Sequence, residues 1–178
     1  MLVHPLIPEK RLQLLPNPNA MAYSNSDSEH GGNSTADWLT ENYSKWQCEL
    51  REGVVAPTCS LGISFANTDI DWTLGIDLSN YNYFEVSIDY TGPAKLMRIN
   101  FRNYSPLISN ANDYNSAKFT QLNIRRKDFN SDLKINLNEF KLADWWVDQF
   151  DLPHKLAHVE FNRVTSFGLD FSQTAPIG

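Results

Sequence analysis

The sequence YFEVSIDYTGPAKLMRINFR, residues 83–102, alternates apolar and polar side chains in two runs on either side of Gly92 and Pro93. Side chains on a β-strand point alternately to its two faces, so a period of two is typical of a half-buried strand. The apolar positions are Phe84, Val86, Ile88 and Tyr90 in the first run and Met97, Ile99 and Phe101 in the second. This stretch therefore predicts an antiparallel hairpin with one face in a hydrophobic core.

A connection over residues 91–96 sets the register of the predicted hairpin. It pairs Tyr90 with Met97, Ile88 with Ile99 and Val86 with Phe101 on the apolar face. On the other face it places Asp89 opposite Arg98, Ser87 opposite Asn100 and Glu85 opposite Arg102. A slip by one residue would carry charges into the core, so the pattern favours this register. We expect a sheet with one polar face.

The rest of the chain shows short apolar runs between turn residues and almost no helical periodicity. A length of 178 residues suits one domain. We expect further strands at 46–50, 61–66, 118–124, 133–137 and 164–171, and loops at 17–35 and 142–153. The pattern predicts an all-β protein, an antiparallel β-sandwich or jelly roll, that spans residues 20–178 after an irregular lead-in over residues 1–19.

Composition excludes several classes of function. The chain is 42% hydrophobic and 20% charged, which is typical of a globular protein. A formal net charge of −6, with no basic run, argues against a nucleic-acid partner. No apolar run approaches the roughly 20 residues that cross a bilayer, and the first residues lack the apolar core of a secretory signal. No motif of a catalytic nucleophile, phosphate loop or metalloprotease is present, so we expect no enzyme and no catalytic residues.

Cys48 and Cys59 are the two cysteines of the chain, and they flank a short loop between expected strands. A disulfide that closes this loop would explain their spacing and would imply an oxidising compartment. The alternative is a pair of buried free thiols. Two cysteines without a nearby histidine fall short of a zinc site.

Several short motifs carry a resemblance to a known family. The motifs are Asp77–Tyr81 before a strand, Arg98–Asn103, Gly31–Ser34, Ser116–Phe119, Trp145-Trp146 and Phe161–Val164. Their order resembles the galactose-binding-like jelly rolls, which include carbohydrate-binding modules and the complex I intermediate-associated protein family. Over residues 20–175 it is most similar to the periplasmic sensor region ahead of GGDEF diguanylate cyclase domains in marine and enteric gammaproteobacteria.

The resemblance implies a non-catalytic, periplasmic ligand-binding sensor domain of an inner-membrane protein, galactose-binding-like in fold. Members of the family continue into a last strand, a membrane helix and a cytoplasmic output domain, whereas this sequence stops at Gly178. We therefore expect a domain truncated before its last strand, or one whose first strand covers the gap. A homodimer is a further expectation. Two alternatives remain: a free-standing carbohydrate-binding module, and a structural or assembly jelly roll without a small ligand.

The predicted ligand site uses the polar face of the hairpin. Arg98, Asn100 and Arg102 form a row of donors for sugar hydroxyls or a carboxylate, joined by Tyr104 and Trp146 from adjoining loops. Of the adjacent Trp145 and Trp146, we expect one in the core and the other exposed as a stacking platform. The alternative is a solvated face whose cross-strand ion pairs each contribute under about 1 kcal/mol.

The loop from Asp27 to Asn33 offers many oxygen atoms. Jelly rolls of the resembled type often hold a structural Ca²⁺ near the first strand, and Asp27 and Glu29 would be its acidic ligands here. The alternative is a solvated turn whose side chains cap their own backbone. We expect no other cofactor.

Overall fold

The computed structural model describes residues 11–14, 20–65, 71–129, 131–153 and 155–171. Its secondary structure is almost entirely β, as the sequence predicts. The strands are β1 (Met21–Ser26), β2 (Thr35–Trp38), β3 (Trp46–Glu49), β4 (Cys59–Ser64), β5 (Tyr83–Ser87), β6 (Leu96–Asn103), β7 (Lys118–Arg125), β8 (Asp132–Asn136), β9 (Lys141–Leu142) and β10 (Val164–Phe171). A short α-helix, α1 (Asp144–Gln149), follows β9, and a 3-10 turn (Asp27–His30) follows β1.

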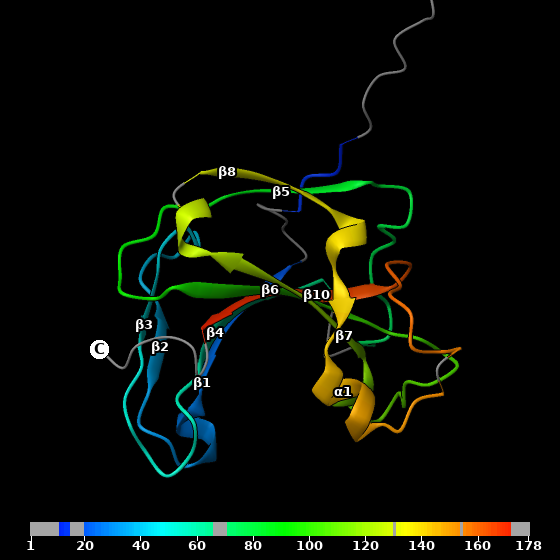
Figure 1. Ribbon diagram of the computed structural model, residues 1–178, viewed down its shortest axis with the longest axis horizontal. Helices are drawn as coiled ribbons and strands as arrows, with labels where there is room; N and C mark the ends of the chain where they lie inside the picture. Colours follow the sequence, from blue (N-terminus) through cyan, green and yellow to red (C-terminus); the bar gives the residue numbers. More distant parts are fainter. Residues whose placement is uncertain (1–10, 15–19, 66–70, 130, 154, 172–178) are drawn as a thin grey trace, which may run out of the picture.

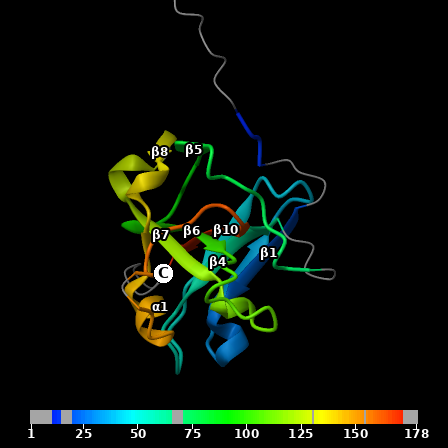
Figure 2. The same ribbon diagram turned by 90° about the vertical axis from the view of Figure 1, so that its right-hand side faces the viewer.

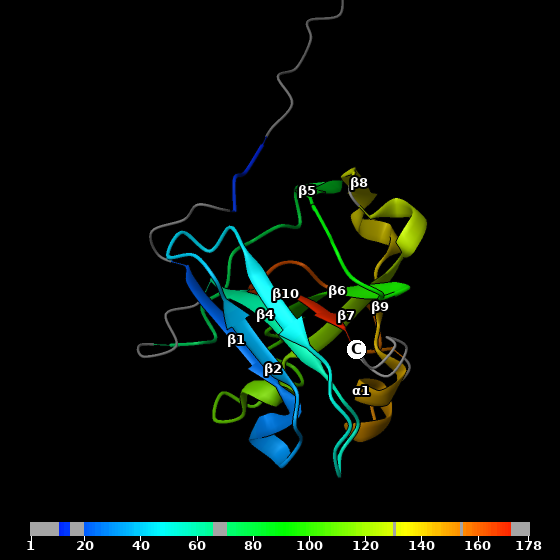
Figure 3. The same cartoon turned by 90° about the vertical axis from the view of Figure 1, so that its left-hand side faces the viewer.

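The main sheet has six antiparallel strands in the order β1-β4-β10-β6-β7-β9. The pair β5-β8 lies over one face of this sheet, and α1 lies on the opposite side (Figures 1 and 2). The pair β2-β3 runs alongside β1 and β4 (Figure 3). No helix within the described ranges is long and apolar enough to cross a membrane.

The hydrophobic core lies between the main sheet and the β5-β8 pair. Ile99 and Phe101 of β6 have no exposed surface. The ring of Phe84, from β5, lies 5.3 Å from the ring of Phe101 and 5.1 Å from that of Phe167 on β10. Each buried side chain of this size contributes about 1.5–3 kcal/mol. The all-β sandwich is thereby confirmed, whereas the jelly-roll topology stays a prediction.

The predicted hairpin is wrong in its pairing. Strand β5 pairs with β8, so Glu85 faces Lys134 at 3.3 Å between Oε1 and Nζ and does not pair with Arg102. Strand β6 lies between β10 and β7 instead. The expected pairs of Asp89 with Arg98 and of Ser87 with Asn100 are also absent from the described strands.

The reason lies in the connection between the two strands. Residues 88–95 form no strand, and the hydroxyl of Tyr90 accepts a hydrogen bond from the backbone N–H of Ala94 at 2.9 Å. Gly92, with φ at 156°, helps the chain turn away from β5. The face prediction for β6 is nevertheless right, because Met97, Ile99 and Phe101 are buried on one side.

Two expected loops contain regular structure. The segment 17–35 contributes β1, which pairs with β4 from Met21–Ser64 to Ser26–Cys59. The segment 142–153 contains α1. Strands expected near 46–50, 61–66, 118–124, 133–137 and 164–171 are present within a few residues of those bounds.

The disulfide between Cys48 and Cys59 is confirmed, with 5.9 Å between the two Cα atoms. Cys48 belongs to β3 and Cys59 to β4, so the bond ties the β2-β3 pair to the main sheet. Cys59 is buried, with its sulfur 3.3 Å from the carbonyl oxygen of Thr35.

Candidate functional site: the polar face of the main sheet

The face of the main sheet that points away from the core is lined by polar and aromatic residues, and we call it the polar face. Strand register brings its residues together from five strands. They are Tyr23 of β1, Gly62 of β4, Ser166, Gly168 and Asp170 of β10, Arg98, Asn100 and Arg102 of β6, and Phe119 and Gln121 of β7. This face is on the side of the sheet where α1 lies (Figure 1).

Two glycines form the centre of the polar face. Gly62 and Gly168 are directly opposite each other on β4 and β10. A Cβ at Gly62 would collide with the ring of Tyr23, and one at Gly168 would lie 2.7 Å from Oδ1 of Asn100. The glycines therefore let Tyr23 and Asn100 lie flat against the sheet, which a larger residue would prevent.

Arg98 is neutralised within the face. Its Nε donates to Oδ2 of Asp170 at 2.9 Å, and its Nη1 donates to Oε1 of Gln121 at 3.3 Å. Asn100 donates to the same oxygen of Asp170 at 2.9 Å. Asp170 is buried, and its other oxygen, Oδ1, has no hydrogen-bond partner in the described part of the chain. Burial raises the pKa of Asp170, against the opposing effects of the Arg98 charge and of the hydrogen bonds from Arg98 and Asn100.

Arg102, unlike Arg98, has its guanidinium beside aromatic rings and not beside a carboxylate of the described residues. Its Cζ lies 5.2 Å from the ring centre of Tyr114 and 5.0 Å from that of Phe119, within cation–π distance. Its Nη1 donates to the carbonyl oxygen of Asn115 at 3.5 Å. No carboxylate of the described residues forms an ion pair with it. Burial lowers the pKa of the Arg102 guanidinium.

Two tyrosine hydroxyls flank Arg102 near Ser166, the residue opposite it on β10. Tyr114 donates to Oγ of Ser166 at 2.7 Å. Burial, with a smaller contribution from Tyr114, raises the pKa of Tyr23 to about 12, although a hydrogen bond with Ser166 and the charge of Arg102 act in the opposite direction. Tyr23 is therefore protonated at neutral pH.

Aromatic rings extend the face beyond Tyr114. The ring of Trp72 lies 5.2 Å from the rings of both Tyr104 and Tyr114, in edge-to-face contact. Its Nε1 donates to the carbonyl oxygen of Ala111 at 2.6 Å. Tyr104, which we expected at the site, is joined to Tyr114 through the ring of Trp72.

The expectation that one of Trp145 and Trp146 lies in the core and the other is exposed is confirmed, but the buried one is Trp146, which we expected at the ligand site. It is 1% exposed, packs with Phe119 and Ala143, and donates from Nε1 to the carbonyl oxygen of Asn115 at 3.2 Å. Its neighbour Trp145 is 45% exposed, with its ring 5.1 Å from that of Phe119. The two side chains diverge because α1 is helical, where consecutive residues point about 100° apart.

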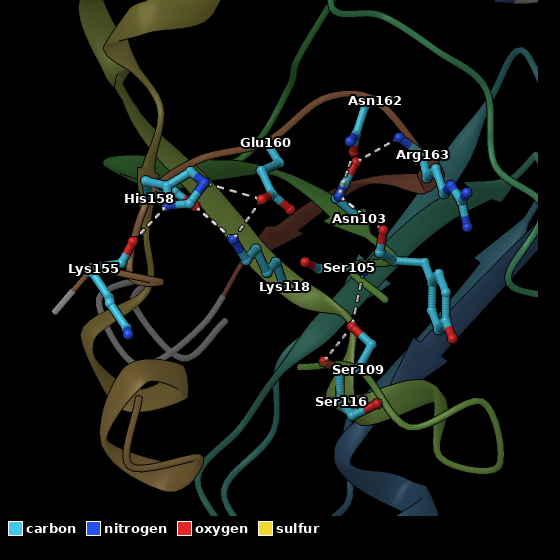
Figure 4. Close-up of polar contacts among 11 residues, drawn as sticks. Asn103, Ser105, Ser109, Ser116, Lys118, Lys155, His158, Glu160, Asn162 and Arg163 are labelled. Atoms are coloured by element: carbon cyan, nitrogen blue, oxygen red, sulfur yellow. Dashed lines mark hydrogen bonds and ion pairs between the residues drawn. The ribbon is translucent and has the colours of Figure 1, made fainter. Parts of the chain in front are cut away.

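A buried polar network holds the loops at one end of the sheet (Figure 4). Lys118 is 1% exposed, and its Nζ lies 3.0 Å from the carbonyl oxygen of His158 and 3.2 Å from Oε1 of Glu160. Glu160 also contacts Nε2 of His158 at 3.0 Å. Burial lowers the pKa of Lys118, and the hydrogen bond and charge of Glu160 oppose that shift.

A second group of hydrogen bonds, around Asn103, holds the loop that carries the tyrosines (Figure 4). Asn103 donates to the carbonyl oxygen of Tyr104 at 3.1 Å and to Oδ1 of Asn162 at 3.2 Å, and its own Oδ1 accepts from the N–H of Arg163 at 2.9 Å. Ser109 then donates to the carbonyl oxygen of Ser116 at 3.1 Å. The loop between β6 and β7 is thus bonded to both of its flanking segments.

Sequence reasoning found the β6 residues of the polar face but missed those from the other strands, among them Tyr23, Ser166 and Asp170, and it missed Tyr114 in the adjoining loop. Ser166, Gly168 and Asp170 alternate with Phe167, Leu169 and Phe171, so the period-of-two signal that marked β6 was present in β10 as well. Tyr23 lay in a segment expected to be a loop.

The expected calcium ligands are not side by side. Asp27 is buried, and its Oδ1 accepts from the N–H of Ser34 at 3.1 Å, whereas Glu29 is exposed. Oδ2 of Asp27 has no hydrogen-bond partner among the described residues. Across those residues no group of three or more His, Cys, Asp or Glu could hold a metal ion. The calcium site stays a prediction, and the bond to Ser34 favours the alternative of a self-capping turn.

Two cavities lie on the other side of the main sheet, between the layers. One has a volume of about 880 Å³ and is lined by residues that include Leu78, Phe84 and Phe167. The other, of about 740 Å³, is lined by residues that include Trp38, Trp46 and Tyr90. Both have mixed linings, with Asn80 and Glu85 at the first cavity and Lys45 and Asp89 at the second. We take the polar face as the candidate site because it gathers a paired charge, amides and hydroxyls on adjacent strands.

No protein-family model, curated protein or solved structure matches this chain.

Proposed function

We propose that this domain binds a small polar ligand, with a sugar as the favoured class, on the polar face of the main sheet. The observation that carries the proposal is the row Arg98, Asn100 and Arg102 on β6, beside the glycine centre and the hydroxyls of Tyr23 and Tyr114. Sugars offer hydroxyls for such donors and C–H faces for aromatic rings. Ligand sites characteristically combine a few convergent polar groups with aromatic surface.

The rigidity of the site supports the same proposal. Strands β6 and β10 lie inside the main sheet, with a bonded strand on each side. A site built on such strands holds its donors in place better than one built on loops. The ligand would therefore meet a preformed surface.

We further propose that the domain acts as a periplasmic sensor. The disulfide between Cys48 and Cys59 suits an oxidising compartment. The resemblance described above assigns the output to a diguanylate cyclase outside this chain, in a parent protein anchored in the inner membrane. Binding would bias that output by favouring one of two arrangements of the parent protein.

A free-standing carbohydrate-binding module is the second candidate, and the exposed ring of Trp145 favours it. It predicts that this chain alone retains insoluble polysaccharide. A structural jelly roll predicts no retention and no small ligand.

The test is a screen of neutral sugars, sugar acids and amino acids by thermal shift, followed by calorimetric titration of the hits. Arg102→Ala should weaken binding at least tenfold, which is 1.4 kcal/mol. The matched control is Arg51→Ala, since Arg51 is exposed and pairs with Glu49 at the surface. An equal loss in both variants, or a loss of stability without a loss of affinity in Arg102→Ala, would contradict the proposal.

A further inference from the structure

The two arginines of the polar face differ in how their charge is compensated. Arg98 has a carboxylate partner in Asp170 at 2.9 Å. Arg102, two residues away, has none among the described residues, and its shown polar contact is the long bond to the carbonyl oxygen of Asn115. Within the described residues, the face therefore carries one ion pair and one arginine that has no ion-pair partner.

Resting on the proposed function, we infer that the ligand carries a carboxylate and that the guanidinium of Arg102 receives it. The favoured class is a sugar acid, with its carboxylate at Arg102 and its hydroxyls near Asn100 and Gln121. Asn100 is on the same strand as Arg102, and Gln121 is opposite Asn100 on β7.

The surroundings of Arg102 suit this role. The Cζ of Arg102 lies 5.2 Å from the ring centre of Tyr114 and 5.0 Å from that of Phe119, and these two aromatic contacts restrain the guanidinium before any ligand arrives. A restrained guanidinium loses little side-chain freedom when it binds a carboxylate through two parallel hydrogen bonds. An anion would also offset the cost of burying the charge.

The acidic residues near Arg102 do not occupy its guanidinium. Asp170 is bonded to Arg98 and Asn100, so its charge is already compensated. Asp113 acts on Arg102 electrostatically but forms no ion pair with it. The hydroxyls of Tyr23 and Tyr114, near Ser166, supply neutral groups beside the cation.

The first experiment uses acetate as the probe and follows the side-chain Nε resonances of the full chain by NMR. Acetate should shift the Arg102 resonance in a saturable way and leave that of Arg51 with at most a small linear drift. A linear, equal drift at both residues would overturn the inference. Because acetate contains no sugar, this result does not depend on whether the proposed sugar binding is correct.

The second experiment compares galacturonate with galactose and glucuronate with glucose by calorimetry. The acid of a pair should bind at least tenfold more tightly than the neutral sugar. Arg102→Gln should remove that preference, and Arg102→Lys should restore part of it because it keeps the charge without the planar fork. Neutral sugars that bind as tightly as their acids would overturn the carboxylate inference and leave the proposed function standing. Saturable acetate binding at Arg102 without any sugar binding would instead contradict the proposal that the ligand is a sugar, and the carboxylate inference would stand.

Discussion

Removal of the disulfide is the perturbation whose magnitude is best defined by the structure. The bond joins residues 11 apart in sequence, Cys48 on β3 and Cys59 on β4. The entropy lost by the unfolded chain on closing a loop of this length corresponds to about 2.8 kcal/mol at 25 °C. We expect Cys48→Ala with Cys59→Ala to lower the free energy of unfolding by about 2–3 kcal/mol.

The assay is equilibrium unfolding in urea, with wild type, reduced wild type and the double variant compared at one pH. The denaturant slope should rise in both forms without the bond, because their unfolded chains expose more surface. Thiol titration of the unfolded wild type should find no free thiol before reduction and two afterwards, as the sequence has two cysteines.

An unfolding free energy that changes by less than about 0.5 kcal/mol would refute the loop-entropy argument, which predicts about 2.8 kcal/mol for this loop length. A loss far larger than predicted would show that the β2-β3 pair depends on the bond for its folding. In that case the variant would lose hydrogen-exchange protection in β2 and β3 first.

Three further predictions concern single groups. The pKa of Tyr23 is raised to about 12, so its contribution to the free energy of unfolding, up to about 2.7 kcal/mol, should be lost as pH rises from about 10 through 12. In an ultraviolet titration, Tyr23→Phe should remove a phenolate that forms at high pH. A titration identical to that of wild type would contradict this prediction. Burial raises the pKa of Asp170, so its contribution to the free energy of unfolding is fully present below about pH 3.9 and is lost as pH rises through the folded-state pKa. The stability of wild type relative to Asp170→Asn should therefore fall as pH rises over that range. A difference that stays flat or increases would contradict this. If Asp27 binds calcium, the ion should raise the melting temperature of wild type but not of Asp27→Asn, and an unchanged melting temperature after chelation would dismiss the site.

Sequence periodicity predicted the faces of β6 but not its partners. The alternation of Met97, Ile99 and Phe101 with Arg98, Asn100 and Arg102 is a local property, so it survives any choice of neighbour. Pairing is decided by contacts between residues far apart in the sequence, here β6 with β10, about 70 residues away. A turn rich in Gly and Pro suggested a hairpin that tertiary packing does not form.

Tyr23 was missed because its strand was missed. A strand whose outward face belongs to a polar surface has few apolar positions, and β1, with Asn25 and three serines or alanines around Tyr23, was therefore interpreted as loop. The sequence does not say which of two adjacent tryptophans is buried, because that depends on packing, here of Trp146 against Phe119 and Ala143. Three of the five proposed ligand residues, Arg98, Asn100 and Arg102, do share one surface.

The position of β6 between β10 and β7 constrains how a bound molecule could act at a distance. Strands β6 and β10 are hydrogen-bonded on both edges, and Phe101 and Ile99 of β6 are buried in the core. The part of the sheet that would lie beneath a ligand is therefore rigid. The loop of Tyr104 and Tyr114 is held to the same strands, because Asn103 at the end of β6 donates to the carbonyl oxygen of Tyr104 (Figure 4). Under the proposed function, binding on the polar face would therefore leave the backbone of β6 and β10 nearly unchanged.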